Sequence, residues 1–498
     1  MLFGNRKFIY YEGVSSLFHL LPVLFFCFHV GFPISYRPKR LKSSQERSHS
    51  IWALSSRLRC LFSDLASKYI PLLLHKKLTK CQIDEARELF NSAFRNTTSK
   101  EDLYNLHFGN VRVGDLIYDT YLKNTRLPTI DLNSKFYKQI LLSSAEEYVY
   151  WRDLAARSAS QAVVVSHTCY LLAIPARVFI SANKRAYQVN HAGVYHVTRD
   201  RQWAYTEYYD FPSIAKSIPC DQLSLLKNEA DLRINRRFSG EVGVDMKYSS
   251  ASAYTNFSST NKRLIRESRN LKILIAAHCL FDAPNGWGIN IFPDFYEWLK
   301  FLSRLSLQTP YDWYLKTHPD FLPGNEDAIS EIISDGNITI IPSKSSHHQI
   351  ISEGVAVCLT VYGTIGFEYA ALGKTVVNAS LDNPHSKYSF NLHVGDKLTY
   401  ENILVDLENN LIAPSRDDVL EYYAMKLFTN TLDWFYKDWD NLTSKIGGRV
   451  PHSPSDLFAC YRFLLWNISY YLEYWRFLSP RLSRFLVSGS YKFYPRHE

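Results

Sequence analysis

The chain has 498 residues, of which 46% are hydrophobic and 21% charged, so length and composition indicate a folded protein of more than one domain rather than a disordered chain. The formal net charge of +9 favours anionic partners, but no block of Lys and Arg and no nucleic-acid-binding signature occurs, which argues against nucleic acid. Eight cysteines without a C-x-x-C pair argue against a zinc site or a disulfide framework.

Residues 1–55 are predicted to be an apolar segment followed by a basic linker. Residues 16–34 are mostly apolar but contain His19, Pro22 and His29, and no small-residue cleavage site is obvious. This segment predicts a membrane anchor, a stretch at the membrane interface, or sequence upstream of the true start. Residues 35–55 are basic and rich in serine, which is typical of a linker.

Residues 56–265 are predicted to form a first α/β domain. The run Ala162–Ser166 predicts a short buried strand, and a helical stretch and a second apolar run around Val178–Ser181 follow it, which is typical of a βαβ unit. The segment FGNVRVGDLIYDTYLK, from Phe108 to Lys123, begins with a turn and continues as an amphipathic run. Residues 240–270 are polar and are predicted to connect this domain to the next.

Residues 266–415 show the clearest pattern, in which short apolar strands alternate with helices. Five strands are predicted, at Lys272–His278, Asp312–Thr317, Asn337–Ile341, Val355–Val361 and Thr375–Ala379. Four helices are predicted between them, at Pro293–Leu305, Glu326–Ser334, His347–Glu353 and Gly366–Leu372. This alternation implies right-handed βαβ units and a parallel sheet. We therefore expect the α/β class, with two Rossmann-like domains and a cleft between them.

Residues 416–498 are predicted to be a helical tail that is dense in aromatic and basic side chains. Aromatic residues interleaved with arginines suit an interfacial membrane helix, and they suit equally well a helix that packs back onto the core. With the positive net charge, the first alternative makes an anionic membrane surface an expected partner.

Polar side chains follow each predicted strand of the second domain, where a parallel sheet binds its ligands. His278 and Asp282 follow the first strand, and Lys316 and His318 end the second. Lys344, His347 and His348 follow the third strand, and of the two adjacent histidines only one is expected to reach a ligand, which we assign to His348. These residue types at one edge of the sheet favour a phosphate-bearing ligand.

The sequence LTVYGTIGFEYAALGKTVV leads from the fourth strand through a glycine turn into a helix. Gly363 and Gly366 let the backbone turn sharply and approach a ligand, and Thr364 adds a hydroxyl donor near the helix start, where a phosphate fits. Glu368 can accept hydrogen bonds from ribose hydroxyls. The alternatives are a tight βα turn and a Glu that pairs with the helix dipole.

The sequence KTHPD, followed by YGTIGFEYAALGKTVV, resembles the C-terminal domain of bacterial capsule polysaccharide biosynthesis proteins. These belong to the GT-B-fold glycosyltransferases with a His-Pro motif, which include Kdo transferases. The resemblance covers residues 271–395, and GDLIYDTYLK also looks like a segment of capsule-type proteins. It implies that His318, Pro319, Thr364 and Glu368 hold the nucleotide, and that residues 56–265 lie on the acceptor side.

The resemblance implies a glycosyltransferase that moves a sugar from a nucleotide-sugar, possibly a CMP-linked one, to a surface or capsular polysaccharide or glycolipid acceptor. No separate cofactor is expected, and the expected location is cytoplasmic, at the inner membrane. Two alternatives remain open. One is a CDP-alcohol phosphotransferase of the teichoic-acid type, and the other is a non-catalytic membrane-bound assembly factor.

An inverting transfer needs a base that takes the proton of the acceptor hydroxyl. We predict this base among Asp115, His167 and Asp282 and favour Asp115, and Asp119 and His278 are further options. Each of two candidates also has a purely structural explanation: Asp115 could cap a helix, and His167 could be a histidine of the core. No Asp-x-Asp pair stands near a strand end of the second domain, which favours chemistry without a metal.

Overall fold

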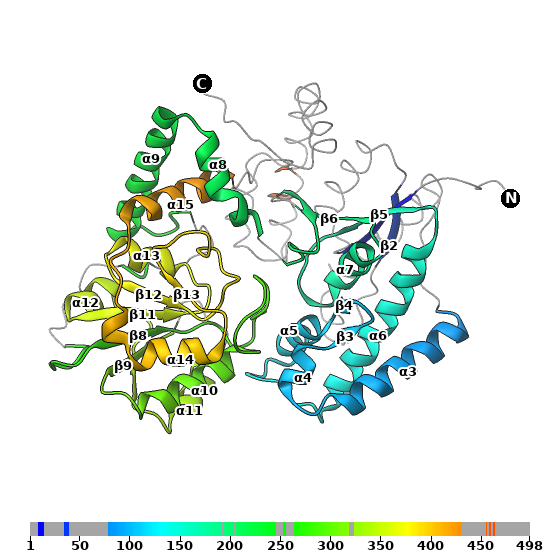
Figure 1. The fold of residues 1–498 in the computed structure, drawn as a ribbon, viewed down its shortest axis with the longest axis horizontal. Coiled ribbons are helices and arrows are strands. Elements are labelled where there is room, and N and C mark those ends of the chain that lie inside the picture. Colours follow the sequence, from blue (N-terminus) through cyan, green and yellow to red (C-terminus); the bar gives the residue numbers. More distant parts are fainter. Residues whose placement is uncertain are drawn as a thin grey trace.

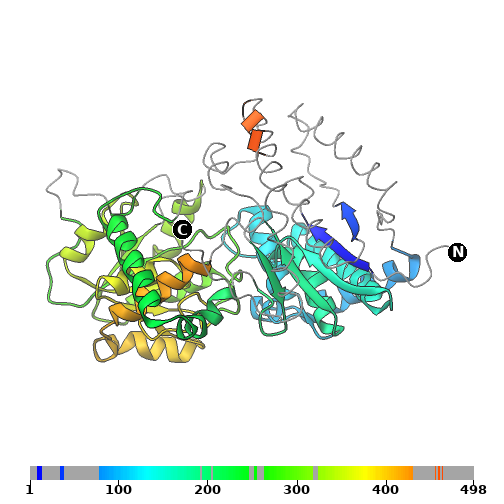
Figure 2. The ribbon, with the colours of Figure 1, turned by 90° about the horizontal axis from the view of Figure 1, so that it is seen from above.

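The computed structural model describes the backbone of residues 8–13 and 34–38, and it describes residues 78–190, 193–203, 206–245, 252–254, 263–317, 323–429, 455, 458–459 and 462–463. Two α/β domains lie side by side in this part of the chain (Figures 1 and 2). The predicted fold class, two Rossmann-like α/β domains, is therefore confirmed. Residues 16–33 of the predicted apolar segment and most of the predicted tail beyond residue 429 lie outside the described residues.

The first domain is built on a five-stranded sheet with the order β2-β1-β5-β6-β7. Its strands are β1 (Phe8–Gly13), β2 (Ile34–Pro38), β5 (Ser160–Val165), β6 (Arg185–Val189) and β7 (Val194–Val197), and only β7 runs antiparallel to its neighbour. Its helices are α3 (Lys80–Asn96), α4 (Lys100–Tyr104), α5 (Gly114–Thr125), α6 (Lys135–Ala156) and α7 (Ile174–Ser181), with a small hairpin of β3 (His107–Phe108) and β4 (Val111–Arg112).

The expected boundary between a terminal segment and a first domain at residue 56 does not match this sheet. Ile9 of β1 pairs with Ala162 of β5 and with Ile34 of β2, so two strands come from residues 1–55. The sequence FIYYEG is aromatic and β-branched enough for a strand, but the long apolar run that follows it dominates the pattern. The first 55 residues therefore contribute to the first domain.

The second domain is built on a parallel sheet with the order β10-β9-β8-β11-β12-β13. The strands are β8 (Lys272–Ala276), β9 (Asp312–Lys316), β10 (Ile338–Ile341), β11 (Val355–Thr360), β12 (Thr375–Asn378) and β13 (Leu392–His393). The helices between and after them are α10 (Phe295–Ser306), α11 (Asn325–Ile333), α12 (His347–Ser352), α13 (Ile365–Ala371) and α14 (Lys397–Val405). All five predicted strands and all four predicted helices are confirmed to within about two residues at each end.

Helices cover both faces of this sheet, as a parallel sheet requires. Ile273 and Ile275 pack into a cluster with α10, α11 and α14, whereas Leu274 packs into a second cluster with α12 and α13. Successive strand residues point to opposite faces, so continuous apolar runs such as KILIA bury both sides of the sheet.

Three further helices extend the second domain beyond its predicted limits of 266–415. They are α8 (Phe211–Ser217), α9 (Cys220–Phe238) and α15 (Arg416–Thr429). Phe211, Ile234 and Tyr422 share one buried cluster with Phe367 of α13. Figure 1 shows α8, α9 and α15 on the same side of the molecule as α13. The chain therefore crosses to the second domain before residue 240, and its first residues after 415 are part of that domain rather than of a separate tail.

The strand order of the second sheet places a topological switch point between β8 and β11, because the chain winds outward from β8 first in one direction and then in the other. Open α/β sheets bind ligands at the carboxyl ends of the strands at this point. Among the described helices, none has the length and apolar character needed to cross a membrane.

Candidate active site between the two domains

The loops that follow β8 and β11 are joined at the switch point by His278. The backbone N–H of Val361 donates to Nε2 of His278 over 3.2 Å, and the Thr360 hydroxyl lies 3.1 Å from the same nitrogen. Because Nε2 accepts, the neutral ring carries its hydrogen on Nδ1. The ring also stacks on Phe295, with 4.5 Å between ring centroids. His278 therefore fixes the shape of the loop that leads to Gly363.

Gly363 has no room for a side chain. A Cβ at this position would lie 2.9 Å from the Thr360 hydroxyl and 3.5 Å from Cε1 of His278. Gly366 is restricted in the same way, because a Cβ there would lie 2.6 Å from Cε1 of the fully buried His385. The predicted glycine turn is thus packed against two histidines, with the half-buried Thr364 at its outer side.

His167 of the first domain follows β5 by two residues. Its Nδ1 accepts a hydrogen bond from the backbone N–H of Cys169 over 3.2 Å. Burial lowers the pKa of His167 below its usual value of 6.5, and the charge of Lys123 lowers it further, although Asp282 acts in the opposite direction. The ring is therefore neutral near pH 7 and carries its hydrogen on Nε2.

Tyr170 and Asp282 connect the ends of the two sheets. The Tyr170 hydroxyl, from the loop after β5, donates to Oδ1 of Asp282 over 3.3 Å, and the backbone N–H of Ala283 donates to the same oxygen over 2.8 Å. Asp282 is exposed, and no described residue bonds to its Oδ2. Tyr170 has a φ of +58°, a backbone conformation that costs of order 1–3 kcal/mol and that clusters at functional sites.

Buried hydrogen bonds hold the two domains together beside this contact. Nδ2 of Asn285 donates to Oδ1 of Asp119 over 2.7 Å, and the Tyr118 hydroxyl donates to Oδ2 of Asp294 over 2.6 Å. Burial and the nearby charge of Asp115 raise the pKa of Asp119 far above its usual value of 3.8. Asp119 therefore holds the junction together and is not an exposed base.

The structure contradicts the role of Asp115 as a base. Its two oxygens accept hydrogen bonds from both terminal nitrogens of Arg177, each over 2.7 Å, and the carboxylate is almost fully buried. Burial opposes ionisation, but the charge and hydrogen bonds of Arg177, the charge of Arg112 and the hydrogen bond of Trp203 together outweigh it and lower the pKa of Asp115. The carboxylate is therefore a buried partner of two arginines.

Glu368 does not have the geometry expected of a ribose-binding carboxylate. Oε1 accepts from Arg237, and Oε2 accepts from the Tyr254 hydroxyl over 2.8 Å, so both oxygens are used. The group is buried. Lys316 is also buried, and burial lowers its pKa to about 8 although the Glu368 charge acts in the opposite direction. These residues form a charged cluster inside the second domain.

His348, which was predicted to reach a ligand, instead contacts the backbone of another helix. Nε2 of His348 lies 2.6 Å from the backbone oxygen of Phe238, so this ring fastens α12 to α9. His318 and Pro319 lie outside the described residues. No group of three or more potential metal-ligating side chains occurs within the part of the chain that the structure describes.

The structure thus places two predicted residues, His167 and Asp282, beside Tyr170, which the sequence analysis did not select, whereas His278 shapes the loop that leads to Gly363. Tyr170 follows β5 by five residues, in a loop that the strand-end rule could have identified. Its contact with a residue 112 positions later gave no signal in the sequence.

No protein-family model and no curated protein sequence matches the chain. Eighteen solved chains are similar to it in structure. The KpsC β-Kdo 2,4 transferase of Thermosulfurimonas dismutans is 10% identical, and the match covers 54% of this chain and 79% of that one with a TM-score of 0.29. A UDP-GlcNAc 2-epimerase of Neisseria meningitidis, solved with UDP-GlcNAc, is 14% identical, with coverages of 59% and 81% and a TM-score of 0.26.

MurG of Acinetobacter baumannii is 12% identical, and the match covers 84% of this chain and 94% of that one with a TM-score of 0.23. Because these TM-scores lie below 0.5, we infer the function from the geometry of the site itself.

Proposed function

We propose that the protein is a glycosyltransferase of the GT-B type that moves a sugar from a nucleotide donor to a surface or capsular polysaccharide or glycolipid. The observation that carries the proposal is the contact between Tyr170 and Asp282. It joins the carboxyl end of β5 in the first sheet to that of β8 in the second, at the switch point of the second sheet, where an open α/β sheet binds its ligand.

The loop from Tyr362 to Thr364 supports binding of the donor phosphates. Gly363 has no Cβ and so allows the tight turn of this loop against Thr360 and His278, and the Thr364 hydroxyl supplies a donor. The resemblance of KTHPD to the His-Pro motif adds His318 and Pro319 to this proposal. A CMP-linked acid sugar is the donor that the same resemblance favours.

Asp282 is the base that the geometry favours. Tyr170 and the Ala283 N–H hold its Oδ1, and Oδ2 remains to take the proton of the acceptor hydroxyl. The acceptor oxygen then bonds to the anomeric carbon while the bond from that carbon to the donor phosphate breaks, so the configuration inverts. His167 is less suited to be the base, because its Nδ1 already accepts a hydrogen bond from the Cys169 N–H.

We further propose that the reaction needs no metal, since arginine, lysine and backbone N–H groups can stabilise the departing phosphate. The net charge of +9 supports work at the cytoplasmic side of an anionic membrane.

Product formation from a panel of CMP-, UDP- and GDP-sugars, with CDP-glycerol as the phosphotransferase arm, tests the proposal. We expect transfer from one sugar donor, with inversion and in the presence of EDTA, and loss of transfer in Asp282→Asn. Transfer from CDP-glycerol alone, or no stabilisation by any nucleotide in a thermal-shift screen, contradicts it.

A further inference from the structure

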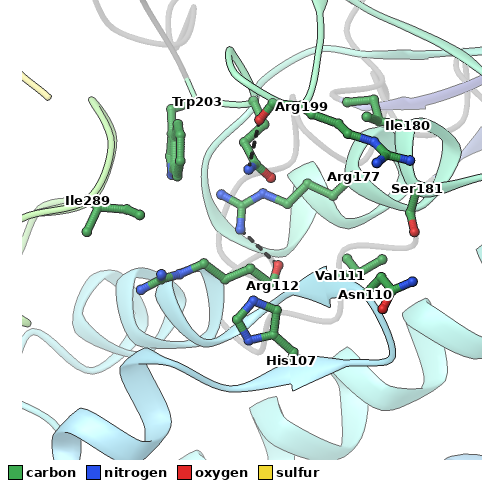
Figure 3. Close-up of a pocket in the computed structure, with 11 residues that line it drawn as sticks. His107, Asn110, Val111, Arg112, Arg177, Ile180, Ser181, Arg199, Trp203 and Ile289 are labelled. Carbon is green, nitrogen blue, oxygen red and sulfur yellow. Dashed lines mark hydrogen bonds between the residues drawn. The ribbon is translucent and has the colours of Figure 1, made fainter. Parts of the chain in front are cut away.

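A cavity of about 370 Å³ lies on the first-domain side of the junction, between the β3–β4 hairpin, α7 and the loop after β7. Its size is at the lower end of the range for small-molecule sites, about 300–1,000 Å³. Ile289, from the loop after β8 of the second domain, lies on the side opposite Ile180 (Figure 3). Both domains therefore contribute to its wall.

The lining of the cavity is strongly basic. The eleven described lining residues include Arg112, Arg177, Arg199 and His107, and none of the eleven is acidic. The nearest fixed carboxylate is Asp115, which bonds to Arg177 behind the lining. Three guanidinium groups against one carboxylate leave an excess of two positive charges, without counting His107.

Two of the arginines keep donors for a ligand. Nη2 of Arg112 donates to the Tyr104 carbonyl over 2.8 Å, and Nη2 of Arg199 donates to Oδ1 of Asn183 over 3.0 Å. A guanidinium has five N–H groups, and no other hydrogen bond to these two is formed by the residues that the structure describes. Nε of Arg112 is buried and has no hydrogen-bond partner there.

The guanidinium of Arg177 and the indole of Trp203 are held in place by the same carboxylate. Nε1 of Trp203 donates to Oδ2 of Asp115 over 3.2 Å, and the Arg177 guanidinium carbon lies 5.8 Å from the Trp203 ring centroid. Arg177 itself is almost fully buried. An aromatic surface beside fixed cations suits a sugar ring that carries a negative charge.

The cavity lies close to the interdomain contact. Asp115 and Asp119 are four residues apart on α5, so they share one helix face and lie about 6 Å apart along its axis. Asp119 bonds to Asn285 at the junction, and Asp115 supports the cavity. A saccharide in the cavity is thus about one helical turn from the junction.

We propose that this cavity binds an anionic saccharide unit, which carries a carboxylate or a phosphate ester. That the cavity is the acceptor site rests on the proposed glycosyl transfer. The binding of an anionic saccharide to the cavity does not depend on that proposal. The cavity could recognise a carboxylate and a phosphate ester in the same way, since arginine binds both groups through paired N–H groups.

Three probes with the same ring test this inference: glucuronic acid, glucose 6-phosphate and glucose. Their affinities for the full-length protein are measured by ligand-observed NMR without nucleotide. We expect one or both anionic probes to bind at least about tenfold more tightly than glucose, the effect of a hydrogen bond to a charged group, and to weaken as salt is added. The tighter of the two anions identifies the source of charge.

Arg112→Gln and Arg199→Gln should each abolish most of this preference, whereas Arg185→Gln, an exposed arginine outside the cavity, should keep it. Arg199 is exposed, so its variant is expected to fold even if the Arg112 variant does not. Equal affinity for the three probes, or the same preference in the Arg199 variant as in wild type, would overturn the inference. Transfer of sugar together with equal probe affinities would reject the cavity and leave the proposed function standing.

Discussion

The Tyr170 hydroxyl donates to Oδ1 of Asp282 over 3.3 Å, although the two residues belong to different domains and lie 112 positions apart. The contact joins the loop after β5 to the loop after β8, so the carboxyl ends of both parallel sheets meet at one place. Because ligand sites of α/β sheets form at these ends, the contact locates the candidate site more sharply than any sequence motif.

Asp282→Asn should lower the turnover number of the proposed transfer by about 10²–10⁴, the usual contribution of a general base. Asn keeps an oxygen that can accept from Tyr170, and the position is exposed, so the free energy of unfolding should change by less than about 0.5 kcal/mol. Steady-state kinetics of the purified variant measure the turnover number, and urea unfolding measures the free energy of unfolding. Asp335→Asn, an exposed carboxylate after α11, is the matched control, and equal activity of the two variants would rule out Asp282 as the base.

Asp115→Asn or Arg177→Met should each destabilise the protein by about 3–5 kcal/mol, because each leaves a buried partner without its counter-charge. The double variant should lose much less than the sum, since it removes the whole ion pair. Urea unfolding of the four proteins gives the coupling free energy. If Asp115→Asn kept its stability but lost all transfer, Asp115 would be a base after all.

Lys316→Met should stabilise the protein at pH 7 but not at high pH. Burial lowers the pKa of Lys316 from 10.5 to about 8, so between these values the unfolded chain holds a proton that the folded chain has released. Wild-type stability therefore rises with pH through this window, and below it the buried charge costs up to about 3 kcal/mol. The gain of the variant should be largest at or below pH 8 and should vanish above about pH 10.5.

Urea unfolding of wild type and Lys316→Met at pH 7, 8.5 and 10 measures this difference, and titrations common to both proteins cancel. Lys300→Met, on the exposed side of α10, controls for the loss of a surface charge. A stability difference between wild type and Lys316→Met that stays constant with pH would show that Lys316 is protonated throughout.

Gly363→Ala should weaken nucleotide binding by about tenfold, the effect of one lost hydrogen bond to a charged group. The new Cβ would lie 2.9 Å from the Thr360 hydroxyl, which must then move away from His278. Gly286→Ala is the control, because its Cβ would meet no atom closer than 3.4 Å. Isothermal titration calorimetry measures the affinity of the two variants and of wild type for the preferred nucleotide. Unchanged affinity in Gly363→Ala would place the nucleotide elsewhere.

Local patterns were sufficient to predict the second sheet. Runs such as KILIA and VAVCLT are apolar on both faces, as parallel strands buried by helices must be. Strand β13 has two residues, too few for any periodicity to be seen. Strand β1 was missed because its partner Ala162 is more than 150 positions away and the apolar run after it suggested a membrane segment.

The candidate site was predicted only in part, because pairing over long distances decides which carboxylates are available. Asp115 is paired with an arginine 62 positions later, and Glu368 with one 131 positions earlier. A sequence shows the carboxylate but not the distant cation. Asp282 stays a prediction, and it was suggested by its position after a strand rather than by its neighbours.

A structure of the protein with its preferred nucleotide-sugar, supported by titration to establish which one binds, tests the central claim most directly. The account predicts the donor phosphates within hydrogen-bond distance of the Gly363–Thr364 loop and the sugar beside Asp282. A nucleotide bound away from the switch point, or with its sugar on the side remote from Tyr170 and Asp282, would contradict it.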